Sequence, residues 1–183
     1  TVTSAGTYHP AQATGDREAI RRHSEELIRR EDNAANRMAQ VRAFLEAGLI
    51  QEAERKLQSF KERYPGQTRL LLIEALLAKR QGHLEQALDL TNRHLEQNQQ
   101  DAAGWRLRGE IARLRGDYDQ AIGDFRKSRL LDDDPDTTVA LAHAYLWAGR
   151  HDEAVSELRA VVRTPSPPAA ARSLLERTYR RLG

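Results

Sequence analysis

A short motif recurs in the sequence at a nearly constant interval. The segments GLIQEAE, GHLEQAL, GDYDQAI and GRHDEAV each open with a glycine and place an alanine five positions later. The glycines are Gly48, Gly82, Gly116 and Gly149, and the alanines are Ala53, Ala87, Ala121 and Ala154. A shortened copy, GDREAI, runs from Gly15 and carries Ala19, so successive alanines are 33 or 34 residues apart. A period of this length is typical of repeat architectures, in which each unit buries its apolar face against its neighbours.

The residues between the glycines have the spacing of α-helices. Residues 68–81 and 84–97 both carry apolar side chains at helical intervals, which predicts helices with one buried face. A single glycine between two such segments favours a tight turn, because glycine adopts a left-handed backbone conformation at little cost. Proline or polar residues follow each second helix, at 65, 98–101 and 132–135. The sequence therefore predicts an all-α fold of about ten helices.

The third unit carries the most complete version of the repeat. Trp105, Gly109, Gly116, Tyr118 and Phe125 stand in phase with its motif alanine. Together they resemble the tetratricopeptide repeat at its tryptophan, small, turn and aromatic positions. The resemblance covers residues 15–183 and implies a right-handed α–α superhelix, or solenoid. It also assigns the five motif alanines, Ala19 included, and the four later glycines to structural positions of the repeat.

The repeat frame divides the chain into parts. Residues 1–15 are rich in Thr, Ser, Gly and Ala, and we expect them to be a flexible lead-in or linker. Residues 16–183 are expected to form the repeat domain. It would consist of a capping helix (16–33), four repeats (34–67, 68–101, 102–134 and 135–168) and a C-terminal helix or half-repeat (169–183).

The chain offers few groups for catalysis or metal binding. Its 183 residues include no cysteine, which excludes disulfides and thiolate chemistry. The six histidines are never three or four positions apart, so they form no helical metal pair. No Gly-rich phosphate loop or Gly-x-Ser-x-Gly motif occurs, and no apolar run is long enough for a transmembrane helix. We therefore expect a protein that is not an enzyme, holds no cofactor or metal, and has no membrane-spanning segment.

The aspartates at 132–134 and 136 form the most acidic stretch of the chain. They lack the alternating ligands and the distant glutamate of a calcium loop. Aspartate is a favoured residue before the first turn of a helix. We expect this stretch to cap a helix that begins near residue 135.

In proteins that this chain resembles, the first helix of each repeat lines a concave groove that receives a peptide. Here the inward positions of those helices carry an excess of basic residues. Arginine suits carboxylates and other oxyanions, and neighbouring apolar side chains serve as anchors. We expect the partner-binding groove to contain Arg42, Arg69, Leu72, Lys79, Arg80, Arg106, Glu110, Arg113, His143, Trp147, Arg177 and Arg180. Further inward positions are Met38, Leu45, Glu46, Leu76, Leu114, Val139, Leu146 and Arg181.

Two functions follow from this groove. The first is a non-catalytic scaffold that binds a protein or peptide partner, with an acidic segment favoured. The alternative is a module of a larger bacterial cell-envelope secretion or polysaccharide-export protein, whose groove contacts an anionic polymer or another subunit. Self-association through the terminal helices is a third option, and a solvated helix face is the plainer interpretation of the same arginines.

The charge and the basic residues narrow these options only in part. The formal net charge of +2 is too small to indicate a specific nucleic-acid partner. Only four of the 29 basic residues are lysines, a bias that is typical of a GC-rich genome. We expect a bacterial protein, and the sequence does not distinguish the cytoplasm from the periplasm.

Overall fold

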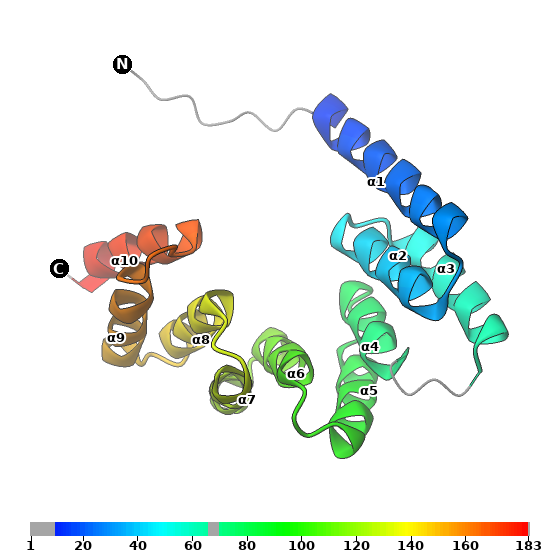
Figure 1. Ribbon diagram of the computed structural model, residues 1–183. Helices are drawn as coiled ribbons and strands as arrows, with labels where there is room; N and C mark the ends of the chain where they lie inside the picture. The colour runs from blue at the N-terminus through cyan, green and yellow to red at the C-terminus, as the bar shows by residue number, and fades with distance from the viewer. Residues whose placement is uncertain (1–9, 66–69, 183) are drawn as a thin grey trace. The chain divides into compact units, whose positions relative to one another are not determined.

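The repeat motif folds into helical hairpins. The computed structural model describes residues 10–65 and 70–182, and within them it contains ten helices and no strand. The helices are α1 (Pro10–Arg30), α2 (Ala34–Glu46), α3 (Ile50–Arg63), α4 (Leu70–Arg80), α5 (Leu84–Gln97), α6 (Ala102–Arg115), α7 (Tyr118–Leu131), α8 (Pro135–Trp147), α9 (His151–Val162) and α10 (Ala169–Leu182) (Figure 1). The predicted all-α class and number of helices are confirmed.

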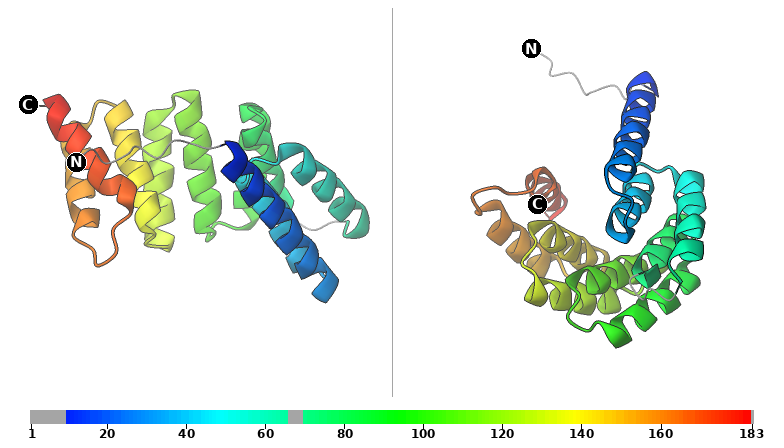
Figure 2. Two further views of the ribbon diagram at one scale, coloured as in Figure 1. Left: turned by 90° about the horizontal axis from the view of Figure 1, so that it is seen from above. Right: turned by 45° about the vertical axis from the view of Figure 1, so that its right-hand side comes forward.

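The helices belong to two units, Thr1–Gly82 and His83–Gly183. The division falls at the turn inside the expected second repeat (68–101). In the first unit, α2 packs against α1, α3 and α4. In the second unit each helix from α5 to α10 packs against the next, and α6 also contacts α8. The left view of Figure 2 shows α5 to α9 standing side by side, as expected for a stack of hairpins.

The turn glycines have the backbone conformation that the motif predicts. Gly48, Gly82, Gly116 and Gly149 have φ angles of 71°, 82°, 86° and 74°. At Gly116 the following amide, that of Asp117, donates to the carbonyl of Ala112 at 2.9 Å and closes the end of α6. Because φ is positive, an L-residue with a side chain would be strained at these four positions.

The motif alanines mark the closest contacts between helices. Ala53, Ala87, Ala121 and Ala154 are each 0% exposed. On the facing helix of the third repeat, a Cβ atom added to Gly109 would lie 2.9 Å from Cε1 of the buried Phe125 ring. Helices α6 and α7 therefore approach to a distance that only the smallest residues permit.

The N-terminal copy of the motif differs from its expected structure. Helix α1 begins at Pro10 instead of residue 16 and runs through Gly15, and Ala19 is exposed. Ala53, Ala121 and Ala154 are buried where the first helix of the same repeat packs against the second, α2 on α3, α6 on α7 and α8 on α9. The segment before Ala19 continues the same helix, so no such partner covers it. Of the expected lead-in, residues 1–9 lie outside the described part of the chain.

The acidic stretch caps a helix as expected. Asp134 is the N-cap of α8, and its side chain accepts a hydrogen bond from the amide of Asp136 at 3.1 Å. Asp101 has the same role at α6, where its Oδ1 accepts from the amide of Ala103 at 3.0 Å. Its Oδ2 lies 2.6 Å from Nε2 of the buried His94. These two aspartates fix the starts of the first helices of the third and fourth repeats.

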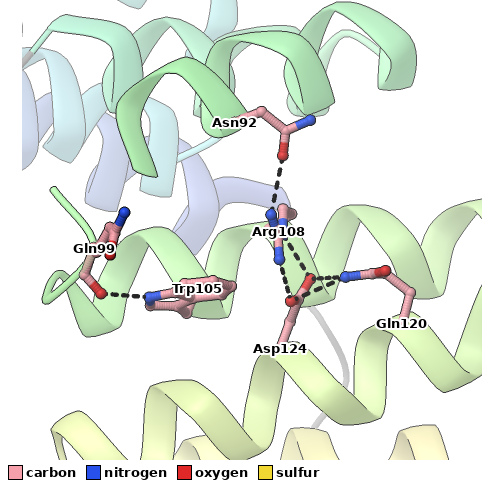
Figure 3. Close-up of polar contacts among 6 residues, drawn as sticks. All are labelled: Asn92, Gln99, Trp105, Arg108, Gln120 and Asp124. Atoms are coloured by element: carbon pink, nitrogen blue, oxygen red, sulfur yellow. Dashed lines mark hydrogen bonds and ion pairs between the residues drawn. The ribbon is translucent and has the colours of Figure 1, made fainter. Parts of the chain in front are cut away.

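A buried ion pair joins three helices of the second unit (Figure 3). Arg108 of α6 donates through Nε and Nη2 to the two carboxylate oxygens of Asp124 on α7, at 2.9 and 2.7 Å. Its Nη1 donates to Asn92 of α5 at 3.1 Å, and Gln120 also donates to Asp124. The Arg108 guanidinium lies 4.5 Å from the centre of the Trp105 ring. Since Asp124 is only 2% exposed, its charge depends on these partners.

Substituting Gly109→Ala tests the close contact between α6 and α7. Alanine favours a helix over glycine by about 1 kcal/mol, yet we expect the variant to lose about 1–3 kcal/mol of unfolding free energy through overpacking against Phe125. Urea unfolding followed by circular dichroism measures the change. Gly123→Ala on α7 is the matched control, because an added Cβ there meets no atom within 4 Å. A Gly109→Ala variant as stable as that control would contradict the proposed contact.

Substituting Asp124→Ala tests the ion pair. It leaves the Arg108 guanidinium without its two strongest hydrogen bonds, and we expect a loss of about 2–3 kcal/mol in the free energy of unfolding. Asp89→Ala is the comparison, because Asp89 forms an exposed pair with Arg93 at 3.8 Å, and such pairs contribute about 0–0.5 kcal/mol. Equal effects of the two substitutions would show that burial does not strengthen the Arg108–Asp124 pair.

Candidate functional site

Helices α8 and α10 border a cleft of about 450 Å³ within the second unit. Seven residues line it: His143, Leu146 and Trp147 from α8, and Leu174, Arg177, Thr178 and Arg181 from α10. Within each helix these residues are three or four positions apart or adjacent, which places them on one face. We call this site the basic cleft.

The repeat explains why these side chains meet. His143 and Arg177 are 34 residues apart, and so are Trp147 and Arg181. Both pairs occupy equivalent positions on the first helices of successive repeats. Stacking of the repeats brings equivalent positions together, and the residues of both pairs line the same cleft.

Local structure fixes both walls of the cleft. Helix α8 starts after its Asp134 cap and ends at Trp147. In the turn that follows, at Gly149, the amide of Arg150 donates to the carbonyl of Tyr145 at 2.8 Å. Trp147 is thereby held in the last turn of α8. Helix α10 starts directly after Pro168, whose carbonyl accepts from the amide of Ala171 at 2.9 Å. Buried Leu174 and Thr178 anchor α10, which leaves Arg177 and Arg181 on its exposed side.

The basic cleft is electrostatically positive. Burial is the main cause that lowers the pKa of His143, and the positive charges of Arg113 on α6 and Arg177 on α10 lower it further. Both guanidinium groups are therefore close enough to act on the same imidazole. Arg181 adds a third guanidinium, and the seven lining residues include no carboxylate. An anion entering the cleft would relieve this repulsion.

An aromatic side chain forms the apolar part of the cleft. Trp147 is 62% exposed, an unusual position for a residue with so much apolar surface. Its ring stacks on that of Tyr118 at the start of α7, with the ring centres 6.1 Å apart and the planes inclined by 20°. The stacking holds the indole in place beside Leu146 and gives a ligand a rigid apolar surface.

The structure brings together part of the expected groove. The basic cleft is lined by His143, Trp147 and Arg177 from the expected groove, and by Leu146 and Arg181 from the further inward positions. The charge of Arg113 acts on the imidazole of His143. Leu174 and Thr178 also line the cleft but were missed by the analysis of the sequence. Ala171, Leu174 and Thr178 are spaced by three and then four residues, and this helical spacing is the signal that could have shown which face of α10 turns inward.

Other expected groove residues of the second unit are engaged elsewhere. Arg106 donates to Asp134, the N-cap of α8, at 3.2 Å. Arg180 lies 3.7 Å from Glu176 on its own helix. Glu110 already interacts with another group of the chain. These residues are not among those that line the basic cleft.

The expected groove residues of the first unit differ in exposure and in their interactions. Leu72 is only 8% exposed, so it packs within the protein and does not serve as an exposed apolar anchor. Lys79 already interacts with another group, while Arg42 and Arg80 are exposed. Arg69 lies outside the described residues.

Neither a metal site nor a membrane span occurs in the described part of the chain. Residues 10–65 and 70–182 contain no group of three or more His, Cys, Asp or Glu side chains placed to hold a metal ion. Among these same segments, none of the helices is long and apolar enough to cross a membrane.

Family comparisons agree with the helical hairpins and with the motif. Two family models described as Tetratricopeptide repeat match residues 72–136 and 112–178, and together they span more than half of the chain. The chain belongs to the tetratricopeptide repeat family. Proteins of this family are generally non-catalytic scaffolds that bind protein partners, and this chain has the fold of such an interaction scaffold.

Solved structures show the same fold. The thermophilic TPR protein TTC0263 of Thermus thermophilus has a TM-score of 0.77 at 21% identity, over 93% of this chain and 94% of that one. The Cut9–Hcn1 hetero-tetramer of APC/C gives 0.70 at 22% identity, over 80% of this chain and 30% of that one. MamA gives 0.57 at 18% identity, over 98% and 99%. No curated protein matches the sequence.

The pKa of His143 tests the charge distribution in the basic cleft. We expect it to lie below the usual value of about 6.5 and to rise in an Arg177→Gln variant, because one of the two positive charges that lower it is removed. NMR titration of the histidine ring signals measures both values. Arg172→Gln, on the same helix but outside the lining, is the control and should leave the pKa unchanged. An Arg177→Gln variant with an unchanged pKa would show that Arg177 does not reach the imidazole.

Proposed function

We propose that this tetratricopeptide repeat protein binds an acidic segment of a partner protein in the basic cleft. The observation that carries the proposal is that Arg113 and Arg177 both act on one half-buried histidine, while Arg181 lines the same cleft and no carboxylate is among the lining residues. A cleft with this charge attracts negatively charged groups and repels basic ones.

The side chains suit carboxylates in particular. A guanidinium group presents paired N–H donors that match the two oxygens of a carboxylate, and such charge-assisted bonds are among the strongest in proteins. Arg177 and Arg181 are one helical turn apart on α10, so they can hold two acidic side chains or both oxygens of one. Their exposure keeps them available for a ligand without a large desolvation cost.

The exposed ring of Trp147 favours a second feature in the ligand, an apolar side chain. Exposed tryptophan side chains fixed in one orientation often contribute most of the affinity of an interface. Trp147 is held by Tyr118 and borders the same cleft as the arginines. The favoured segment therefore carries an apolar or aromatic residue next to its acidic ones.

The volume of the basic cleft sets the size of what it holds. About 450 Å³ is within the range of sites that accept a few side chains. A short stretch of a partner fits this space, whereas a folded surface would contact only its rim. Thr178 donates its hydroxyl to the carbonyl of Leu174 at 2.8 Å, so that hydroxyl belongs to the helix.

Charge reversal on α10 tests the proposal. In an Arg177→Glu/Arg181→Glu variant, we expect binding of an acetylated peptide of six aspartates and one phenylalanine to weaken at least about tenfold, because attraction becomes repulsion. Isothermal titration calorimetry at about 0.1 M salt measures the affinity.

An Arg159→Glu/Arg172→Glu variant, with both positions exposed and outside the lining of the cleft, provides the matched control for the change in net charge. It should bind the peptide nearly as well as the unmodified chain. If the peptide bound both variants equally weakly, the loss of affinity would come from the net charge of the protein and not from the cleft. Undiminished binding by the Arg177→Glu/Arg181→Glu variant would contradict the proposal. A polyuronate that binds better than the peptide would favour an anionic polymer as the ligand.

A further inference from the structure

We infer that His143 takes up a proton when an acidic segment enters the basic cleft, so that the protein holds this ligand more tightly at mildly acidic pH than at neutral pH. The inference rests on the proposed function, because it requires an anionic ligand in this cleft. It adds a means of regulation that the charge of the arginines alone does not supply, since arginine remains protonated at every physiological pH.

His143 is placed to respond to a ligand. It lines the cleft together with Trp147 and Arg177 and is half-buried on the face of α8 that α10 opposes. A carboxylate bound by Arg177 or Arg181 would therefore lie beside the imidazole. The ring is buried enough for the surrounding charges to act strongly on it and exposed enough to exchange protons with solvent.

The charges around His143 come from several helices. Arg113 of α6 and Arg177 of α10 act on it directly, and Arg181 lines the same cleft. Glu110, one turn before Arg113 on α6, already interacts with another group. Neither of the two charges that shift the pKa of His143 is negative.

Helices α7 and α9 also pack against α8. Arg129 of α7 pairs with Glu157 of α9, so these two charges offset each other. Arg150, just before α9, pairs with Glu153 at 2.8 Å. The positive surroundings of His143 therefore arise from α6 and α10, the two helices that a ligand in the cleft would approach.

Without a ligand, the neutral imidazole is favoured. Burial first, and then the charges of Arg113 and Arg177, lower the pKa of His143 from its ordinary value. At neutral pH the histidine therefore carries no charge and contributes one donor and one acceptor nitrogen. It does not strengthen the attraction for an anion in this state.

A bound carboxylate reverses this preference. A negative charge within about 4–6 Å stabilises the protonated ring, and the imidazolium donates from both nitrogens. The pKa of His143 is thus higher in the complex than in the free protein. Because the complex then binds more protons than its free components, its stability increases as pH falls through the interval between the two pKa values.

The size of the effect follows from the change in pKa. Each unit by which binding raises the pKa increases the affinity by up to about tenfold between high and low pH. The carboxylates of the ligand titrate near pH 4, so they stay largely ionised down to about pH 5.5. The affinity therefore rises between about pH 7.5 and 5.5 before protonation of the ligand weakens it.

The test uses the acetylated hexa-aspartate peptide with one phenylalanine as the probe. Calorimetric titrations at pH 5.5, 6.5 and 7.5, each in two buffers of different ionisation enthalpy, measure both the affinity and the protons taken up. We expect an affinity gain of at least about threefold at pH 5.5 with net proton uptake. His143→Gln should abolish both, while His83→Gln should retain them, because His83 is exposed in the turn before α5.

NMR titration of the unmodified protein gives a second readout that needs no variant. The ring signal of His143 should titrate at higher pH with saturating probe than without it. Probe that binds with the same affinity at all three pH values, with no change in the titration of His143, would overturn this inference and leave the proposed function intact. Probe that fails to bind at every pH would overturn the proposed function itself.

Discussion

The close approach of paired helices is the constraint on which the structure depends. In the third repeat, Gly109 and Ala121 let α6 and α7 meet around the ring of Phe125, and Ala53, Ala87 and Ala154 are equally buried in the other repeats. This contact fixes the distance between α6 and α7. The positive φ angles of the turn glycines then reverse the chain between the paired helices. Each hairpin leaves an apolar face that only a neighbouring hairpin can cover. The stack of repeats is therefore required for stability, and it also determines which side chains meet.

The basic cleft follows from that stacking. Residues separated by one repeat become neighbours, which is how His143 meets Arg177 and Trp147 meets Arg181. The repeat supplies the positions, while the residues at those positions differ between repeats. At α8 and α10 they combine cationic and aromatic side chains without a carboxylate, whereas Arg106 in the preceding repeat is paired with the cap of α8. The chemistry of the basic cleft therefore comes from the particular residues of α8 and α10 and not from the repeat itself.

The sequence predicted the fold far better than the site. Regular recurrence of glycine and alanine was sufficient for the helices, their turns and the buried alanines, because each depends on local spacing. The shortened copy at Gly15 did not predict a turn correctly, because α1 continues through Gly15. A glycine in a helical segment marks a turn only where a second helix packs against the first. Three of the residues that repeat position grouped, His143, Trp147 and Arg177, line the basic cleft. Repeat position could not show that Arg106 is paired with Asp134, 28 residues away, or that Leu72 is buried. Such outcomes depend on side-chain packing between helices, which periodicity does not describe.

The two tryptophans of the chain allow the most direct test of binding in the basic cleft. Trp147 is exposed in the cleft, while the indole N–H of Trp105 donates to the carbonyl of Gln99 at 2.8 Å and lies outside it. Their indole N–H signals can be followed separately by ¹⁵N NMR while the acidic peptide is added. The account predicts a saturable shift of the Trp147 signal and little change at Trp105. Saturable binding that shifts the Trp105 signal, or neither signal, would place the ligand elsewhere and contradict the account.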